Sequence, residues 1–126
     1  MSKSIMDQVA EAKKLVSPIS PKDAMGMVER EDVLIVDVRE APEIAESGKV
    51  AGALHVSRGM IEFRADETIP SHNTAFAKNK TIILYCASGG RAVLCGIALM
   101  DLGYKNVRSM GAFKDWVEVG GAVDKG

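Results

Sequence analysis

Two uninterrupted apolar runs constrain the fold more than any other feature of the sequence. The first is Val33-Leu34-Ile35-Val36, and the second extends from Thr81 to Tyr85 and reads TIILY. A strand with one solvated face alternates apolar and polar side chains, whereas a strand buried on both faces is apolar throughout and is typical of parallel sheets. Because helix-like segments separate the two runs, the chain is predicted to fold as one α/β domain with a mainly parallel sheet.

Helical patterns fill most of the chain between and around these strands. Ser20 and Pro21 are typical of an N-cap and a first helical residue, and this helix is predicted to run to about Arg30. Further helices are predicted at residues 4–16, 41–47, 73–79, 91–102 and 112–118, with a helical turn at 59–63. Short strands are predicted at residues 53–56 and 107–110. A chain of 126 residues without an internal repeat or linker fits a single domain.

Composition and charge argue against several classes of function. A net charge of -1 gives no general attraction to nucleic acid or to an anionic membrane, so neither is expected as a partner. Two cysteines are too few for a disulfide framework, and the two histidines show no metal-ligand spacing, so no metal site is expected. Asp7 and Glu11 interrupt the apolar residues near the N-terminus, which argues against a secretory signal. We therefore expect a cytoplasmic protein with free thiols.

The second apolar run ends at a cysteine that is followed by unusually small residues. The segment is Cys86, Ala87, Ser88, Gly89, Gly90 and Arg91, called the Cys86 loop below. In open α/β sheets, binding sites lie at the carboxyl ends of the strands. Small residues let such a loop curl and turn successive backbone N–H groups inward, while the start of the next helix and the arginine add positive charge. All three contributions favour an anion at the centre of the loop.

One candidate anion is the thiolate of Cys86 itself. An ordinary thiol is mostly protonated at neutral pH, and an electropositive loop of this kind would make the thiolate a major form. We therefore predict that Cys86 is a nucleophile rather than the small buried apolar residue that a free cysteine often is. Cys95 lies among apolar residues of the predicted helix 91–102 and is expected to pack in the core, with a resolving or redox role as the alternative.

Taken together with other segments in the same order, these residues resemble a rhodanese domain, of the sulfurtransferase family. The segments that carry the resemblance are residues 37–40 (DVRE), 48–54, 86–91, 102–104 and 111–116. The resemblance implies the rhodanese-like fold, a five-stranded, mainly parallel sheet flanked by helices, with an extra N-terminal helix. Residues 1–16 would form this helical extension and residues 17–126 the rhodanese-like domain.

The resemblance also implies a reaction. Cys86 would take a sulfane sulfur from a donor such as thiosulfate, become a persulfide, and pass the sulfur to a thiol or to cyanide. Arg91 and the amides of residues 87–91 would bind the anionic donor or the persulfide. No metal or organic cofactor is implied. The expected partners are a small anionic sulfur donor, a thiol or cyanide acceptor, and, as a further candidate, a sulfur-relay protein.

Two alternatives to sulfur transfer stay open at this point. Four residues separate Cys86 from Arg91, one fewer than in the related cysteine phosphatases, whose loop wraps a tetrahedral phosphate. The residue before the cysteine is Tyr85, where the tyrosine-phosphatase signature has histidine. Both differences favour the sulfurtransferase, and a cysteine-dependent phosphatase or arsenate reductase is the alternative enzyme. A non-catalytic rhodanese-like binding module is the alternative from another class.

Three charged residues outside the loop are further candidates. Asp37 and Arg39 follow the first apolar run, so they are expected near the same edge of the sheet. In the family such residues mainly order the neighbouring loops, and a supporting role is predicted for both. Arg58 follows the strand predicted at 53–56 and is either a second cation for an anionic donor or an ordinary surface residue.

Overall fold

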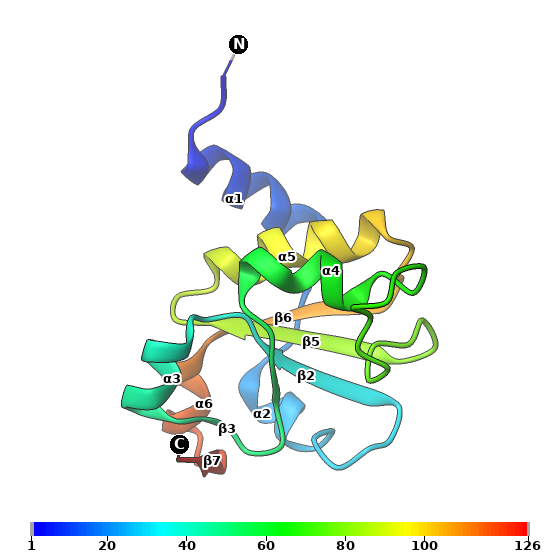
Figure 1. Ribbon diagram of the computed structural model, residues 1–126. Helices are drawn as coiled ribbons and strands as arrows, with labels where there is room; N and C mark the ends of the chain where they lie inside the picture. The colour runs from blue at the N-terminus through cyan, green and yellow to red at the C-terminus, as the bar shows by residue number, and fades with distance from the viewer. Residues whose placement is uncertain (1, 126) are drawn as a thin grey trace.

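The computed structural model describes residues 2–125, and its main element is a five-stranded parallel sheet (Figure 1). The strands are β1 (Ser17–Pro18), β2 (Val33–Asp37), β4 (Leu54–His55), β5 (Thr81–Cys86) and β6 (Val107–Ala112). Their order is β1-β6-β5-β2-β4, and every neighbouring pair is parallel. The two apolar runs form β2 and β5, which lie side by side with Val33 opposite Thr81. The predicted α/β fold with a parallel sheet is confirmed.

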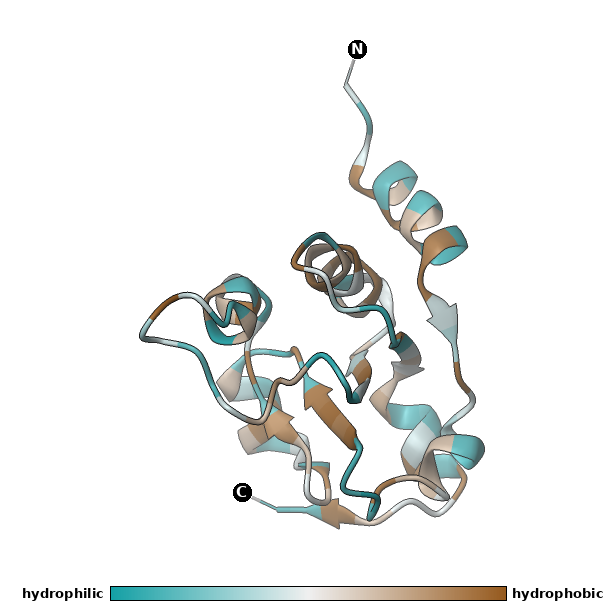
Figure 2. Cartoon of the chain, turned by 90° about the vertical axis from the view of Figure 1, so that its right-hand side faces the viewer, coloured by the Kyte–Doolittle hydropathy of each residue, from teal (hydrophilic) through white to brown (hydrophobic). Residues whose placement is uncertain are grey.

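Successive side chains of the central strands point to opposite faces of the sheet and pack in two separate hydrophobic cores. Leu34 and Leu84 point to one face and join a cluster with α1 (Ile5–Leu15), α4 (Ile61–Ala65) and α5 (Gly90–Asp101). Ile35 and Tyr85 point to the other face, which α2 (Pro21–Met25) and α6 (Phe113–Glu118) cover. In Figure 2 the brown strands run between helices on both sides. The strands are apolar throughout because each face is covered by helices.

The N-terminal helix α1 shares a core with the rest of the chain. Val9, Ala12 and Val16 belong to the same buried cluster as α5. The two segments are very close, since a Cβ atom on Gly96 would lie 2.7 Å from a methyl carbon of Val16. The segment expected as an extension is therefore packed on the domain. None of the helices in residues 2–125 is both long and apolar enough to cross a membrane.

The carboxyl edge of the sheet carries two smaller elements. α3 (Ala41–Ser47) follows β2 there, and a 3-10 turn at Arg58–Met60 leads into α4. β3 (Lys49–Val50) and β7 (Val123–Asp124) form a separate antiparallel pair that fixes the C-terminal segment. Neither β1 nor this pair was predicted.

Two predicted helices need correction. The helix capped by Ser20 begins at Pro21 and ends at Met25 rather than near Arg30, with Gly26 as its C-cap. The helix predicted at residues 73–79 is wrong, because this segment consists of turns. The side chain of Asn73 accepts a hydrogen bond from the backbone N–H of Ala75 at 2.9 Å, which competes with helix formation. Phe76 packs edge-on against Tyr104, with ring centroids 6.3 Å apart, so its apolar side chain anchors a loop.

Candidate active site

The Cys86 loop lies at the carboxyl edge of the sheet, where β5 gives way to α5. Gly89 has φ 100° and ψ -19°, a left-handed conformation that glycine adopts without steric cost. In this conformation its backbone N–H donates a hydrogen bond to Cys86 Sγ at 3.0 Å. At least one amide of the loop therefore points at the sulfur.

The surroundings of the sulfur combine burial with the N-terminus of a helix. The first N–H groups of α5 have no partner within the helix, and they give this end of it a partial positive charge. Cys86 is 0% exposed, whereas Ala87 and Ser88 beside it are exposed. The sulfur thus lies below the surface of the loop, beneath residues that solvent can reach.

A β-bulge in β6 lies against the loop. The register between β5 and β6 shifts after Leu84, so that Tyr85 faces Gly111 and Cys86 faces Ala112. Gly111 has φ 86°, which favours glycine. A Cβ atom on Gly89 would lie 3.5 Å from the Cα atom of Gly111, so the two backbones are close. The sequence analysis did not assign Gly111 to the site. A glycine within a strand often marks a β-bulge, and this is the signal that could have indicated it.

Arg91 forms a two-pronged ion pair with Glu43 of α3. Its two terminal nitrogens lie 2.8 Å from the two carboxylate oxygens of Glu43. The hydrogen bonds from Arg91 lower the pKa of Glu43 to about 2, and the same contact raises the pKa of Arg91, with a smaller contribution from Cys86. The charged end of Arg91 is therefore held by α3. The sequence did not reveal Glu43, because its partner is 48 residues away.

Replacing Glu43 with glutamine is expected to lower the free energy of unfolding by about 1 kcal/mol at neutral pH. The ion pair is about a third exposed, with side-chain exposures of 30% for Arg91 and 35% for Glu43, so solvent screens much of its strength. Since folding lowers the Glu43 pKa from 4.5 to about 2, its contribution is present above pH 4.5 and is lost as the pH falls through about 2.

Urea unfolding of both proteins from pH 7 down to pH 3 measures this difference. The gap between wild type and Glu43→Gln should narrow as the pH falls below about 4.5, because Glu43 then binds a proton in the unfolded chain while it stays ionised in the folded protein. Glu46→Gln is the matched control, since Glu46 is an exposed carboxylate of the same helix. If the difference in the free energy of unfolding between wild type and Glu43→Gln stays constant with pH, the ion pair does not stabilise the fold.

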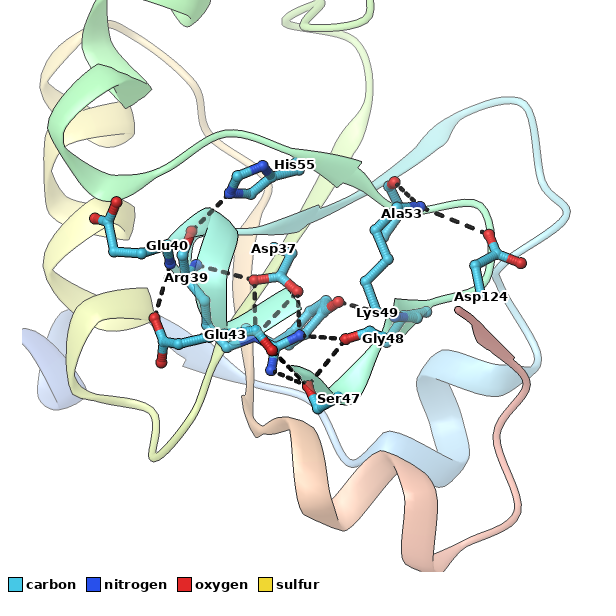
Figure 3. A network of polar contacts seen from close by, with 12 residues as sticks. Asp37, Arg39, Glu40, Glu43, Ser47, Gly48, Lys49, Ala53, His55 and Asp124 are labelled. Atoms are coloured by element: carbon cyan, nitrogen blue, oxygen red, sulfur yellow. Dashed lines mark hydrogen bonds and ion pairs between the residues drawn. The ribbon is translucent and has the colours of Figure 1, made fainter. Parts of the chain in front are cut away.

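Asp37 and Arg39 form a buried pair beside the loop (Figure 3). Arg39 Nη2 lies 2.7 Å from Asp37 Oδ2, and the guanidinium also donates to Ser47 Oγ and to the carbonyl of Gly48, both at 2.8 Å. The pair thus joins the end of β2 to the end of α3. Such an arrangement fits the supporting role predicted for both residues.

Arg58 begins the 3-10 turn that leads into α4, and its backbone N–H donates a hydrogen bond to the carbonyl of Val38. It lines a hollow between α1, α4 and α5 together with Cys95, which is 1% exposed. Burial raises the pKa of Cys95 to about 12, and the charge of Arg58 acts in the opposite direction. Arg58 thus lines a hollow beside Cys95, and its role as a second cation for the donor stays a prediction. Within residues 2–125, no group of three His, Cys, Asp or Glu side chains is placed to hold a metal ion.

Comparison with known sequences gives consistent matches. A family model described as a rhodanese-like domain matches residues 20–119, which include the Cys86 loop and exclude α1. A sulfurtransferase of Allochromatium vinosum is 34% identical over 95 residues, covering 75% of this chain and 80% of that protein. A thiosulfate sulfurtransferase of Coxiella burnetii is 28% identical over 99 residues, covering 78% and 84%.

Solved structures with a similar fold cover nearly the whole chain. A Rhodopseudomonas palustris protein described as a possible tyrosine phosphatase matches with a TM-score of 0.89 and 31% identity, covering 98% of this chain and 96% of that one. The polysulfide-sulfur transferase homodimer of Wolinella succinogenes matches with a TM-score of 0.75 and 29% identity, covering 94% and 85%. The structural likeness thus extends beyond the residues that the family model matches.

Proposed function

The chain belongs to the rhodanese-like family, and from this premise we propose that it is a sulfurtransferase that carries sulfur as a persulfide on Cys86. The observation that carries the proposal is the hydrogen bond from the backbone N–H of Gly89 to Cys86 Sγ at 3.0 Å. An amide aimed at the sulfur, at the start of α5, stabilises negative charge on the sulfur of both the thiolate and the persulfide.

The proposed cycle consists of two displacements at sulfur. The Cys86 thiolate attacks the outer sulfur of the donor, a new sulfur–sulfur bond forms, and the donor's own sulfur–sulfur bond breaks. With thiosulfate, sulfite leaves with the electron pair. An acceptor thiolate or cyanide then attacks the outer sulfur of the persulfide, and Cys86 leaves as a thiolate. No metal, oxidant or reductant is needed for the balance.

The residues around Cys86 have separate roles in this proposal. The amides of residues 87–91 bind the anionic donor and the persulfide. Arg91 contributes mainly its positive charge, because both of its terminal nitrogens are engaged by Glu43. Asp37 and Arg39 keep the neighbouring turn in place and do not touch the reacting atoms. Arg58, which is exposed at the start of the turn after β4, is the candidate for a second cation that attracts the anionic donor.

A phosphatase is the second candidate, because the Rhodopseudomonas palustris protein covers nearly the whole chain and is described as a possible tyrosine phosphatase. A phosphatase arginine binds the phosphate through two nitrogens, whereas Arg91 already uses two of its five N–H donors on Glu43, at 2.8 Å each. Cys86 is also 0% exposed, which suits a donor with one protruding sulfur atom better than a bulky phosphate ester. These contacts support sulfur transfer over phosphate hydrolysis.

Intact mass spectrometry after incubation with thiosulfate tests the proposal directly. We expect the mass of one sulfur atom to be added, to map to the peptide that contains Cys86, and to be lost on treatment with cyanide. Polysulfide is the second donor to try, since the Wolinella succinogenes relative is named for it. Failure to form the adduct, together with turnover of a phosphate ester, would favour the phosphatase. Neither reaction would favour a binding module.

A further inference from the structure

A second hollow, of about 380 Å³, borders the Cys86 loop on the side of α1 and β1. Apolar side chains form much of its lining, among them Val16, Val93 and Met110. The remaining lining includes Ser88, Gly89 and Lys13. A volume of this size accommodates a small organic molecule. We call it the Lys13 hollow.

The Lys13 hollow is connected to the reacting sulfur through one residue. Gly89 lines the hollow, and its backbone N–H is the group that lies 3.0 Å from Cys86 Sγ. The backbone of Gly89 is thus shared between the hollow and the hydrogen bond to the sulfur. Ser88 also lines the hollow and is exposed, whereas Gly89 is buried. A molecule bound here therefore lies against the same loop that holds the sulfur.

The charge of the hollow is positive and comes from one residue. Lys13 is the only charged residue in its lining, and its side chain is exposed. Within residues 2–125, the structure shows no ion pair for Lys13. The hollow thus combines an apolar wall with a cation at its edge, and a ligand with an apolar part and one negative group would complement both.

We propose that the Lys13 hollow binds the sulfur acceptor, and that this acceptor is a small organic thiol whose carboxylate pairs with Lys13. The inference rests on the proposed function, in which the acceptor thiolate attacks the outer sulfur of the Cys86 persulfide. Its sulfur forms a bond to that outer sulfur, and the bond to Cys86 breaks with the electron pair left on Cys86. An inorganic donor has no carbon atoms to place against Val16 and Val93, whereas an organic thiol does. Lys13 lies in α1, outside the matched residues 20–119.

The acceptor step can be measured separately from the loading step. The protein is loaded with thiosulfate, freed of excess donor, and mixed with mercaptoacetate or with neutral β-mercaptoethanol. Lys13→Ala should slow loss of the persulfide to mercaptoacetate by about three- to fivefold at low salt, and less at high salt, as is typical of an exposed ion pair. The rate with β-mercaptoethanol should not change. Each thiol is compared with itself, so differences in nucleophilicity cancel.

Lys14→Ala is the matched control. Lys13 and Lys14 are both exposed and both lie in the last turn of α1, where a cation stabilises the helix end. Only Lys13 lines the hollow. Lys14→Ala should therefore leave both rates unchanged. Three results would overturn the inference in favour of a general charge effect. Lys14→Ala could slow loss of the persulfide as much as Lys13→Ala does, or Lys13→Ala could slow the reaction with both thiols equally. Lys13→Ala could also slow loading by thiosulfate as much as it slows the reaction with mercaptoacetate.

A binding experiment keeps this inference separate from the proposed function. If the wild type forms no persulfide, the proposed function fails, but the hollow is still testable by NMR with mercaptoacetate. Binding should shift the methyl signals of Val16, Val93 and Met110, and Lys13→Ala should weaken the binding. Unchanged methyl signals at every concentration would refute the hollow as a thiol site, even if the persulfide forms normally.

Discussion

Replacing Cys86 with serine is expected to reduce sulfur transfer from thiosulfate to cyanide by at least about a thousandfold. The hydroxyl of serine is rarely ionised at neutral pH and is a poor nucleophile toward sulfur, so the covalent intermediate does not form. The substitution preserves the rest of the site, because serine has a similar volume and its oxygen still accepts the hydrogen bond from Gly89. The loss of activity therefore reports on the chemistry of the sulfur.

Cys95→Ala is the control for a general effect of losing a thiol. Cys95 is 1% exposed, and burial raises its pKa to about 12, so it is protonated and unreactive at neutral pH. This variant should retain transfer activity. The rate of thiocyanate formation measures both variants, and circular dichroism confirms that they are folded. Substantial activity in Cys86→Ser, or an equally complete loss in Cys95→Ala, would contradict the assignment.

The central sheet could be predicted because its signal is local. A strand covered on both faces is apolar at most positions, and residues 33–36 and 82–85 show this without reference to any partner. The helix predicted at 73–79 shows the opposite case. Its apolar residues are three in a row, Ala75, Phe76 and Ala77, and Phe76 is buried from a loop and packs on Tyr104. Whether an apolar residue belongs to a helix face or anchors a loop depends on packing that the local pattern does not contain.

The same distinction applies to the candidate site. The Cys86 loop could be predicted as a unit because its six residues are contiguous and their small size has a clear backbone consequence. The partner of Arg91 could not, since Glu43 comes from a different helix. The sequence also could not predict that Arg58 and Cys95 line the same hollow. The direction of an exposed side chain depends on the elements packed around it. Strand ends thus place residues at an edge of the sheet, and tertiary packing decides where their side chains lie.

Arg39→Met is expected to lower the free energy of unfolding by about 3–5 kcal/mol, the usual cost of breaking a buried ion pair. Asp37 is 0% exposed and Arg39 is 4% exposed. Three groups accept hydrogen bonds from the guanidinium, as Figure 3 shows, namely the Asp37 carboxylate, Ser47 Oγ and the carbonyl of Gly48. The guanidinium carbon also lies 4.4 Å from the centre of the Phe113 ring. Methionine fills similar space but leaves the Asp37 carboxylate buried without a counter-charge.

The chain provides its own control in Arg30 and Asp32. This pair has the same two-residue spacing, with 2.8 Å between nitrogen and oxygen, but its side chains are 55% and 54% exposed. Arg30→Met should leave the urea midpoint unchanged within error, because water replaces the lost contact. The double variant Asp37→Asn with Arg39→Met should regain part of the lost stability, because no buried charge remains unpaired. Equal effects of the two arginine substitutions, or a double variant no more stable than Arg39→Met, would show that the unpaired carboxylate is not the cause of the loss.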